Sequence, residues 1–125
     1  MATHYRGYRD LKVFQPSYAL ALEVFEVSKA FPSEERYSMT AQIRRCSRSV
    51  PANLAEAWRR RIYEKAFVSK LIDSSSEEAE MEVWLDMCKD CGYISSEMHE
   101  GFLLKYEEVG KMLSSMIAHP EKFCH

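Results

Sequence analysis

The sequence predicts an all-α protein that folds as an antiparallel, up-down-up-down four-helix bundle. Its 125 residues include only four glycines and four prolines, and residues that favour helices supply much of the rest. Four stretches place apolar residues at alternating steps of three and four, which is the period of an amphipathic helix. Short connections between such helices favour antiparallel neighbours. The length suits one domain with its own core.

The first predicted helix covers residues 11–31. Its predicted apolar stripe consists of Phe14, Tyr18, Ala21, Leu22, Phe25 and Ser28. Pro16 fits the first turn, where the missing amide hydrogen costs nothing. Pro32 ends the helix, because the residue before a proline disfavours the helical conformation.

The second predicted helix begins near Ser33 or Ser38, since either hydroxyl can cap free amides. Its apolar stripe consists of Met39, Ile43, Cys46, Val50, Leu54 and Ala57. Pro51 lies inside this stripe and removes the hydrogen bond to the carbonyl of Ser47. The stripe continues beyond the proline, so we expect a helix that is kinked near Pro51 and does not end there.

The third and fourth predicted helices are separated by Gly92, which can adopt a positive φ after a helix end. The third stripe consists of Phe67, Leu71, Ser74, Glu78, Met81, Leu85 and Cys88. Its period is unbroken at the three consecutive serines, so we expect one long helix. The fourth stripe consists of Met98, Phe102, Tyr106, Val109, Leu113 and Met116 or Ile117. Pro120 ends this helix.

The predicted domain plan has three parts: an irregular arm at residues 1–10, the bundle at 11–118 and a tail at 119–125. No apolar run approaches the roughly 18 residues that a membrane span needs, and the N-terminal stretch lacks the apolar core of a secretory signal. We therefore expect a cytoplasmic protein without a membrane partner. Its four cysteines are expected to stay reduced.

Charge is unevenly distributed along the chain. Residues 36–70 contain nine Lys or Arg and two acidic residues, whereas residues 71–108 contain eleven Asp or Glu and two lysines. Such regions compensate each other within a fold or across a subunit interface, or they mark a nucleic-acid surface. Both interpretations stay open at this point.

A basic group on and after the second helix is the main candidate binding site. It consists of Arg44, Arg45, Arg48, Arg59, Arg60, Arg61 and Lys65. Guanidinium groups bind phosphates bidentately, so one interpretation is contact with RNA or DNA that carries little sequence preference. The other is that these residues pair with the acidic helices or with a neighbouring subunit. Trp58 lies beside them and is predicted as an interface residue, because large aromatics are enriched in interface centres.

No catalytic or metal-binding constellation is predicted. Cys88 and Cys91 have the CxxC spacing, but no second such pair accompanies them. The carboxylates of the third helix lack the Glu-x-x-His pairs that di-iron bundles use. No serine lies in a strand-to-helix elbow, and no glycine-rich loop suits a phosphate. We therefore expect a protein that is not an enzyme and holds no cofactor or metal.

Several short motifs occur in an order that is similar to a known family. They are YRDLKVFQ at 8–15, FPSEERY at 31–37, QIRR at 42–45, SVPANLAEA at 49–57, EMEVWL at 80–85 and GYIS at 92–95. Over residues 8–117 the chain resembles the 23S rRNA-intervening-sequence protein family. The resemblance implies an up-down four-helix bundle that assembles as a homopentamer. A related branch, the accessory proteins of diversity-generating retroelements, consists of basic pentamers that bind nucleic acid.

These observations predict a non-enzymatic homo-oligomer, pentameric by the resemblance, that acts as a scaffold or adaptor. In one interpretation its arginines bind RNA or DNA, and the repetition of one patch around an oligomer raises the affinity. In the alternative, the chain is a protein–protein interaction module whose charges serve only self-assembly. The exposure of the arginines in the assembled protein distinguishes the two.

Overall fold

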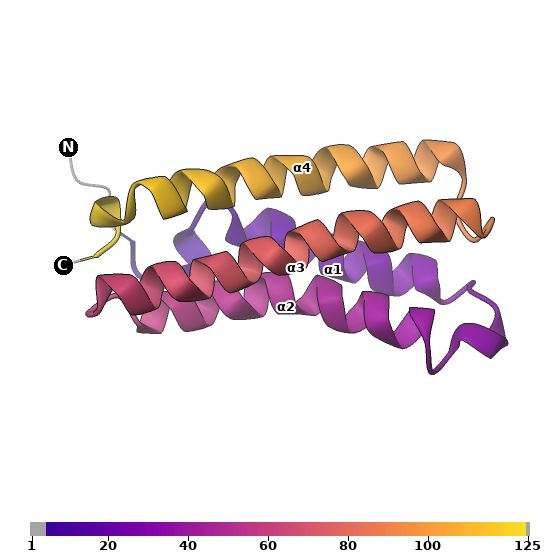
Figure 1. Ribbon diagram of the computed structural model, residues 1–125, viewed down its shortest axis with the longest axis horizontal. Helices are drawn as coiled ribbons and strands as arrows, with labels where there is room; N and C mark the ends of the chain where they lie inside the picture. The colour runs from indigo at the N-terminus through magenta and orange to yellow at the C-terminus, as the bar shows by residue number, and fades with distance from the viewer. Residues whose placement is uncertain (1–4, 125) are drawn as a thin grey trace.

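The computed structural model describes residues 5–124 and contains four α-helices (Figure 1). They are α1 (Phe14–Ser28), α2 (Met39–Arg59), α3 (Glu64–Asp90) and α4 (Ser96–Ala118). Three short 3-10 helices accompany them: η1 (Tyr8–Asp10), η2 (Ser33–Glu35) and η3 (Pro120–Lys122). Residues 5–124 contain no strand, so the predicted all-α class is confirmed.

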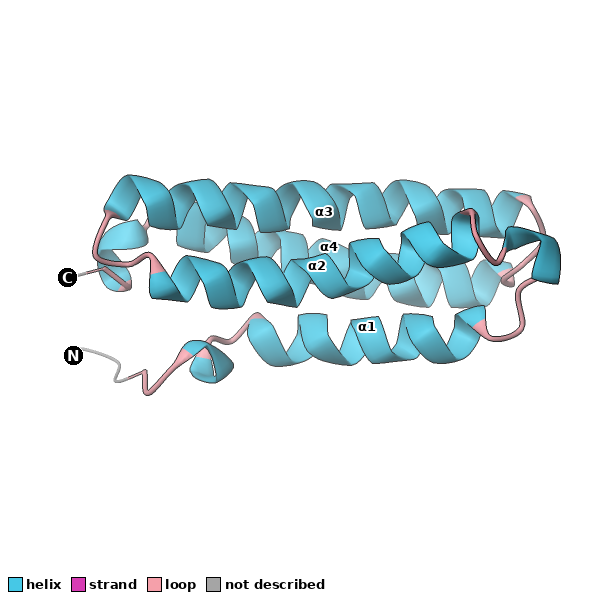
Figure 2. Ribbon diagram, turned by 90° about the horizontal axis from the view of Figure 1, so that it is seen from below, coloured by secondary structure: helices cyan, strands magenta, loops and turns pink. Residues whose placement is uncertain are grey.

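Consecutive helices run in opposite directions along the bundle (Figures 1 and 2). The α1–α2 and α3–α4 connections lie at one end, and the α2–α3 connection lies at the other end with both termini. The most extensive packing joins α2 to α3, followed by α3 to α4 and α1 to α2. Since α1 also packs on α4 but not on α3, α1 and α3 occupy diagonal positions.

The buried face of α1 differs from the predicted stripe. Its buried residues are Phe14, Ser17, Leu20, Ala21, Val24 and Ser28. The predicted core residues Tyr18 and Leu22 are instead 49% and 55% exposed. The period alone could not select the face, because α1 carries apolar residues on more than one side. Ser17 tolerates burial because its hydroxyl donates to the carbonyl of Phe14 at 2.9 Å.

The predicted apolar stripe of α2 is confirmed, since all of its members are buried. The helix begins after Ser38, although the Ser38 hydroxyl does not cap it. The carboxylate of Glu35 accepts instead, from the Ser38 hydroxyl and from the backbone N–H of Met39. Pro51 lies inside α2 and the helix continues past it, while the kink stays a prediction. Beside Pro51, the hydroxyl of Ser74 donates to the carbonyl of Val50 at 2.8 Å, which joins α3 closely to α2.

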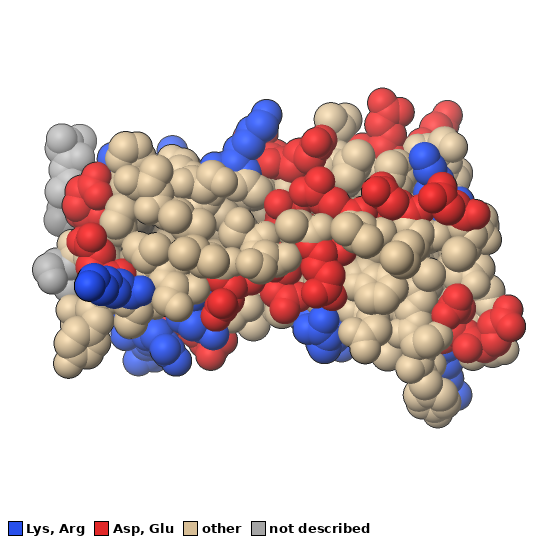
Figure 3. Space-filling model, viewed as in Figure 1, with Lys and Arg blue, Asp and Glu red and all other residues tan. Residues whose placement is uncertain are grey.

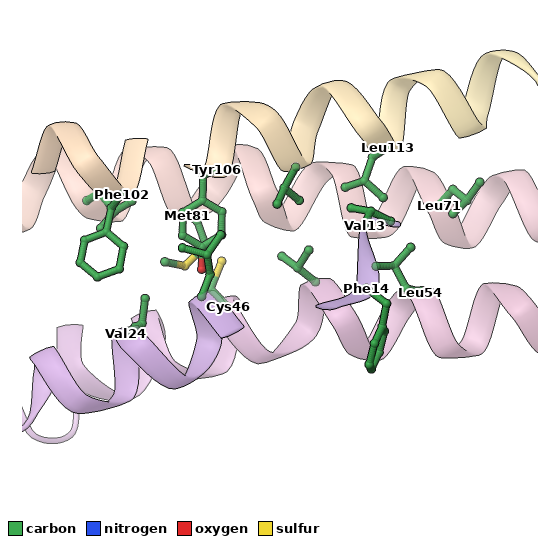
Figure 4. Close-up of a cluster of buried hydrophobic side chains, with 14 of the residues drawn as sticks. Val13, Phe14, Val24, Cys46, Leu54, Leu71, Met81, Phe102, Tyr106 and Leu113 are labelled. Carbon is green, nitrogen blue, oxygen red and sulfur yellow. The ribbon is translucent and has the colours of Figure 1, made fainter. Parts of the chain in front are cut away.

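The predicted stripes of α3 and α4 are also buried, apart from Met98, which lies on the surface. Figure 4 shows side chains from all four helices pointing into the shared core, among them Val24, Cys46, Met81 and Tyr106. Gly92 has the predicted positive φ of 78°, and the Ser95 hydroxyl caps α4. No helix within residues 5–124 is long and apolar enough to cross a membrane.

An aromatic cluster closes the end of the bundle where the termini lie. The ring of Tyr5 packs 5.8 Å from that of Trp58 and 5.6 Å from that of Phe123, and the Phe123 ring lies 6.0 Å from Phe67. The arm and tail are therefore packed on the bundle over the described residues. The parts of the predicted arm at residues 1–4 and of the predicted tail at residue 125 lie outside these residues.

Candidate functional site

The predicted basic residues form two separate groups along α2. The central arginine cluster consists of the predicted Arg44, Arg45 and Arg48 together with Arg36, which was not predicted, and all four line an open depression of about 610 Å³. The terminal basic cluster consists of Arg6, Arg9, Arg59, Arg60, Arg61 and Lys65, four of which line a depression of about 440 Å³. Arg48 and Arg59 are eleven residues apart, which corresponds to roughly 16 Å along a helix. The predicted site is therefore two sites.

Within the central cluster, Arg45 is held by acidic residues of α3. Its guanidinium group lies 3.0 Å from the carboxylate of Glu80 and 3.6 Å from that of Glu77. The indole N–H of Trp84 also donates to Glu80 at 2.9 Å. For this one arginine, the structure therefore matches the interpretation in which basic and acidic helices compensate each other within the fold.

Arg44 and Arg48 project from α2 toward α1. Their guanidinium carbons lie 4.7 Å and 5.7 Å from the ring centre of Phe25, and Arg44 also donates to the Ser28 hydroxyl at 2.7 Å. Within residues 5–124 neither arginine forms an ion pair. Stacking on an aromatic ring orients a guanidinium group without neutralising it. Both positive charges therefore remain available to a partner.

The terminal basic cluster gathers side chains from the end of α2, the start of α3 and the arm. Arg59, Arg60 and Lys65 are exposed, and no ion pair joins them to an acidic residue anywhere between residues 5 and 124. The guanidinium carbon of Arg61 lies 3.5 Å from the ring centre of Trp58. Arg61 also donates to the carbonyls of Trp58 and Phe123. Arg61 therefore holds the tail, while the other three face solvent.

Two members of this cluster, Arg6 and Arg9, were missed in the sequence. Arg9 stacks on Tyr8 with its guanidinium carbon 4.7 Å from the ring centre, and the backbone N–H of Arg6 donates to the Asp10 carboxylate. The arm has no helical period that could place it beside the end of α2. The repeated Tyr–Arg pairing at residues 5–6 and 8–9 is the signal that was available.

Trp58, predicted as an interface residue, is covered by its own chain. It is 7% exposed, with the Tyr5 ring against its edge and the Arg61 guanidinium over its face. Trp58 therefore supports the arm and the tail, which pack on it.

An apolar groove between α1 and α2 lies between the two basic clusters. This α1–α2 groove has a volume of about 530 Å³ and a mostly apolar lining. Phe14, Tyr18, Leu22 and Phe25 line it from α1, and Ala52 and Ala55 line it from α2. Sequence reasoning missed it because it assigned Tyr18 and Leu22 to the core.

The opposite side of the bundle is acidic. Figure 3 shows Asp and Glu side chains gathered on the face where α3 lies in front, over the middle of α3 and toward α4. Beneath this face, Glu78 is only 5% exposed and its Oε2 has no hydrogen-bond partner within the described residues. Burial, with Glu82 and Glu107 nearby, raises the pKa of Glu78 to about 9. Glu78 is therefore a neutral acid at physiological pH.

One group of residues places possible metal ligands close together. Cys46, Glu77 and Glu80 present ligand atoms within 4.8 Å of one another. Arg45 already pairs with both carboxylates, and the Cys46 thiol donates to the carbonyl of Glu77 at 3.2 Å. Burial also raises the pKa of Cys46 far above its usual range, which opposes the thiolate that a metal requires. These residues do not fit a metal in the arrangement observed.

The comparisons with known proteins agree with this architecture. A family model described as 23S rRNA-intervening sequence protein matches residues 9–115. A crystal structure of a protein of unknown function from the S23 ribosomal protein family of Bacteroides thetaiotaomicron is similar, with a TM-score of 0.77 and 29% sequence identity. The similarity covers 85% of this chain and 95% of that one. No curated protein matches the sequence.

Proposed function

Since the chain belongs to the 23S rRNA-intervening sequence protein family, we propose that it is a non-enzymatic, homo-oligomeric scaffold or adaptor that binds RNA or DNA. The terminal basic cluster is the contact surface in this proposal. The pentameric state comes from the family resemblance in the sequence.

The observation that carries the proposal is the convergence of arginines from two separate segments on one depression. Arg6 and Arg9 from the arm meet Arg59 and Arg61 from the end of α2. Neighbouring cations without acidic partners repel one another and so destabilise the folded chain, and an anionic ligand reduces this repulsion. Guanidinium groups match phosphate oxygens in geometry as well as in charge.

Exposed aromatic surface accompanies these cations. Tyr63, next to the end of α2, is 70% exposed, and Tyr8, which is partly buried beneath Arg9, lines the same depression as the arginines. Bases of single-stranded nucleic acids stack on such rings without sequence preference. The combination favours a single-stranded segment over a duplex as the ligand.

Binding through several phosphates has a characteristic dependence on salt. Each neutralised phosphate releases condensed counterions, so the affinity should fall steeply as the salt concentration rises. A single subunit offers few such contacts. An oligomer repeats the cluster, and simultaneous contacts on one strand raise the overall affinity.

The proposal can be tested by fluorescence anisotropy with a labelled single-stranded RNA and its DNA counterpart. The double variant Arg59→Glu, Arg60→Glu should weaken binding by at least about tenfold at low salt and flatten the salt dependence, because two phosphate contacts become repulsive. Lys111→Glu, an exposed reversal on α4, is the matched control and should bind within about twofold of wild type. Equal affinity of wild type and double variant, or no binding by wild type, would refute the proposal.

The second candidate function is a protein–protein interaction module whose charges serve self-assembly. Arg44 and Arg48, which stack on Phe25, and the acidic face over α3 favour it, because surfaces of opposite charge attract each other between copies. Charge reversals separate the two candidates. An oligomer that survives reversal of Arg59 and Arg60 and loses RNA supports the adaptor, whereas an oligomer that binds no RNA and dissociates on reversal of Arg44, Arg45 and Arg48 supports the assembly module.

A further inference from the structure

We propose that copies of this chain assemble head to tail, with the α1–α2 groove of one copy receiving an exposed apolar stripe of α3 from the next. This inference rests on the homo-oligomer in the proposed function and assigns the surfaces that meet. It also gives the two clusters different roles: Arg44 and Arg48 of the central arginine cluster serve assembly, and the terminal basic cluster serves nucleic-acid binding.

The groove is an apolar surface without a partner in its own chain. Tyr18 and Leu22 are each about half exposed, and Phe25 is partly buried at the same side of α1. Exposed apolar side chains that adjoin one another mark interaction sites in soluble proteins more often than isolated ones do. Arg48 lines the groove, and Arg44 lies beside it on the same phenyl ring. A fitting partner is therefore apolar in the centre and acidic at its edge.

The exposed side of α3 has this composition. Its central residues recur at steps of four, three, four and four, so they share one face of the helix. They are Ile72, Ser76, Ala79, Val83 and Met87, all of them exposed. We call this exposed set the α3 stripe, as distinct from the buried stripe of the same helix. The stripe is apolar or small along its whole length, although it faces solvent in the single chain.

Acidic residues border the α3 stripe on both sides. By helical position, Asp73 and Glu80 lie at one border, and Glu82 and Asp86 lie at the other. Figure 3 shows acidic side chains gathered over the middle of α3 on this side of the molecule. Glu80 already pairs with Arg45 of its own chain, but Glu82 forms no ion pair within residues 5–124. Glu82 therefore offers opposite charge to the guanidinium groups of Arg44 and Arg48 when a second copy docks. Such complementarity selects the register of an interface and disfavours contact between two like surfaces.

The two surfaces cannot meet by two-fold symmetry. The groove belongs to α1 and α2, while the stripe belongs to α3, which lies diagonally opposite α1. Each copy therefore offers one groove and one stripe to different neighbours. Contacts of this heterologous kind continue until they close into a ring or extend as a filament. In a closed ring all copies are related by rotation, so their terminal basic clusters lie on one circle.

Mixing two variants tests this arrangement. Leu22→Lys blocks the groove and leaves the stripe intact, and Val83→Lys does the reverse. Both positions are exposed, so the fold should persist, which far-UV circular dichroism checks. Leu104→Lys, at an exposed apolar position of α4, is the matched control. The measurement is the molar mass by sedimentation velocity at micromolar concentration.

We expect wild type and Leu104→Lys to form the same oligomer and each of the two blocking variants to sediment as a monomer. An equimolar mixture of Leu22→Lys and Val83→Lys should give dimers and nothing larger, because only one intact groove and one intact stripe can meet. Oligomers that persist in either blocking variant, or a mixture that stays monomeric, would overturn the proposal.

The remaining outcomes separate this inference from the proposed function. A monomeric wild type would refute the oligomer itself and with it this inference. Loss of assembly in Leu22→Lys alone would mean that the groove holds something other than the α3 stripe. Intact oligomers in Arg44→Glu, Arg48→Glu that no longer bind RNA would place nucleic acid at the groove edge, which also overturns the assignment.

Discussion

Replacement of Glu78 by glutamine should change how the stability of this protein depends on pH. The pKa of Glu78 is about 9 in the folded chain, against 4.5 for an ordinary glutamate. Between these values the folded state binds a proton that the unfolded state has released. The free energy of unfolding therefore falls as pH rises through this range, and the contribution that is present below pH 4.5 is lost by the time pH passes about 9.

The size of the effect follows from the interval between the two pKa values. One pKa unit corresponds to about 1.4 kcal/mol, so between pH 4.5 and neutrality wild type should lose up to about 3.4 kcal/mol of its free energy of unfolding through this group. Glutamine has nearly the same size and does not titrate. Its buried amide costs about 1–3 kcal/mol if it stays unpaired. The variant should therefore be the less stable protein near pH 5 and the more stable one near pH 8.

The assay is urea denaturation followed by circular dichroism over this pH range, with Glu108→Gln on the exposed side of α4 as the control. The control should retain the slope of wild type, and Glu78→Gln should have a flatter one. Parallel pH profiles in wild type and Glu78→Gln would contradict this prediction, since they would mean that Glu78 is ionised in the folded protein.

Two further predictions concern the packing around Glu78 and around Trp58. A Cβ at Gly110 would collide with the Glu78 carboxyl group, so Gly110→Ala should lower the free energy of unfolding by about 1–3 kcal/mol. Gly101 has open space around it, so Gly101→Ala should raise the free energy of unfolding by up to about 1 kcal/mol in the same urea assay. Equal effects at both glycines would contradict this account. Arg61→Ala removes the guanidinium group that covers Trp58 and donates to the Phe123 carbonyl. In a Trp84→Phe background, acrylamide should therefore quench the fluorescence of Trp58 more strongly. Unchanged quenching would mean that the arm alone shields the indole.

Three of the four buried stripes could be predicted from the sequence because an apolar residue recurs at steps of three and four along each helix. In α2 the arginines beside Ile43 and Cys46 leave a single choice of core face. In α1 the face could not be chosen in this way, since Tyr18 and Leu22 share its period with the apolar residues that are actually buried. The error had a consequence for function, because those two residues line the groove.

The candidate site could be predicted only in part. The basic residues were identifiable by type, but their partners depend on how α2 is rotated against α3, which no local pattern contains. Arg45 therefore turned out to be paired, whereas Arg48, three residues later, has no acidic partner within the described chain. The positions of Arg6 and Arg9 could be predicted only with knowledge of the arm's path, which the packing of Tyr5 on Trp58 determines.

The most direct test of the proposed function is co-sedimentation of a labelled single-stranded RNA with the assembled protein at low salt. We expect the label to sediment with the wild-type oligomer and to remain free when Arg59 and Arg60 are both reversed, although that variant still sediments as an oligomer. Label that remains free beside an intact wild-type oligomer would show that the protein does not bind this RNA.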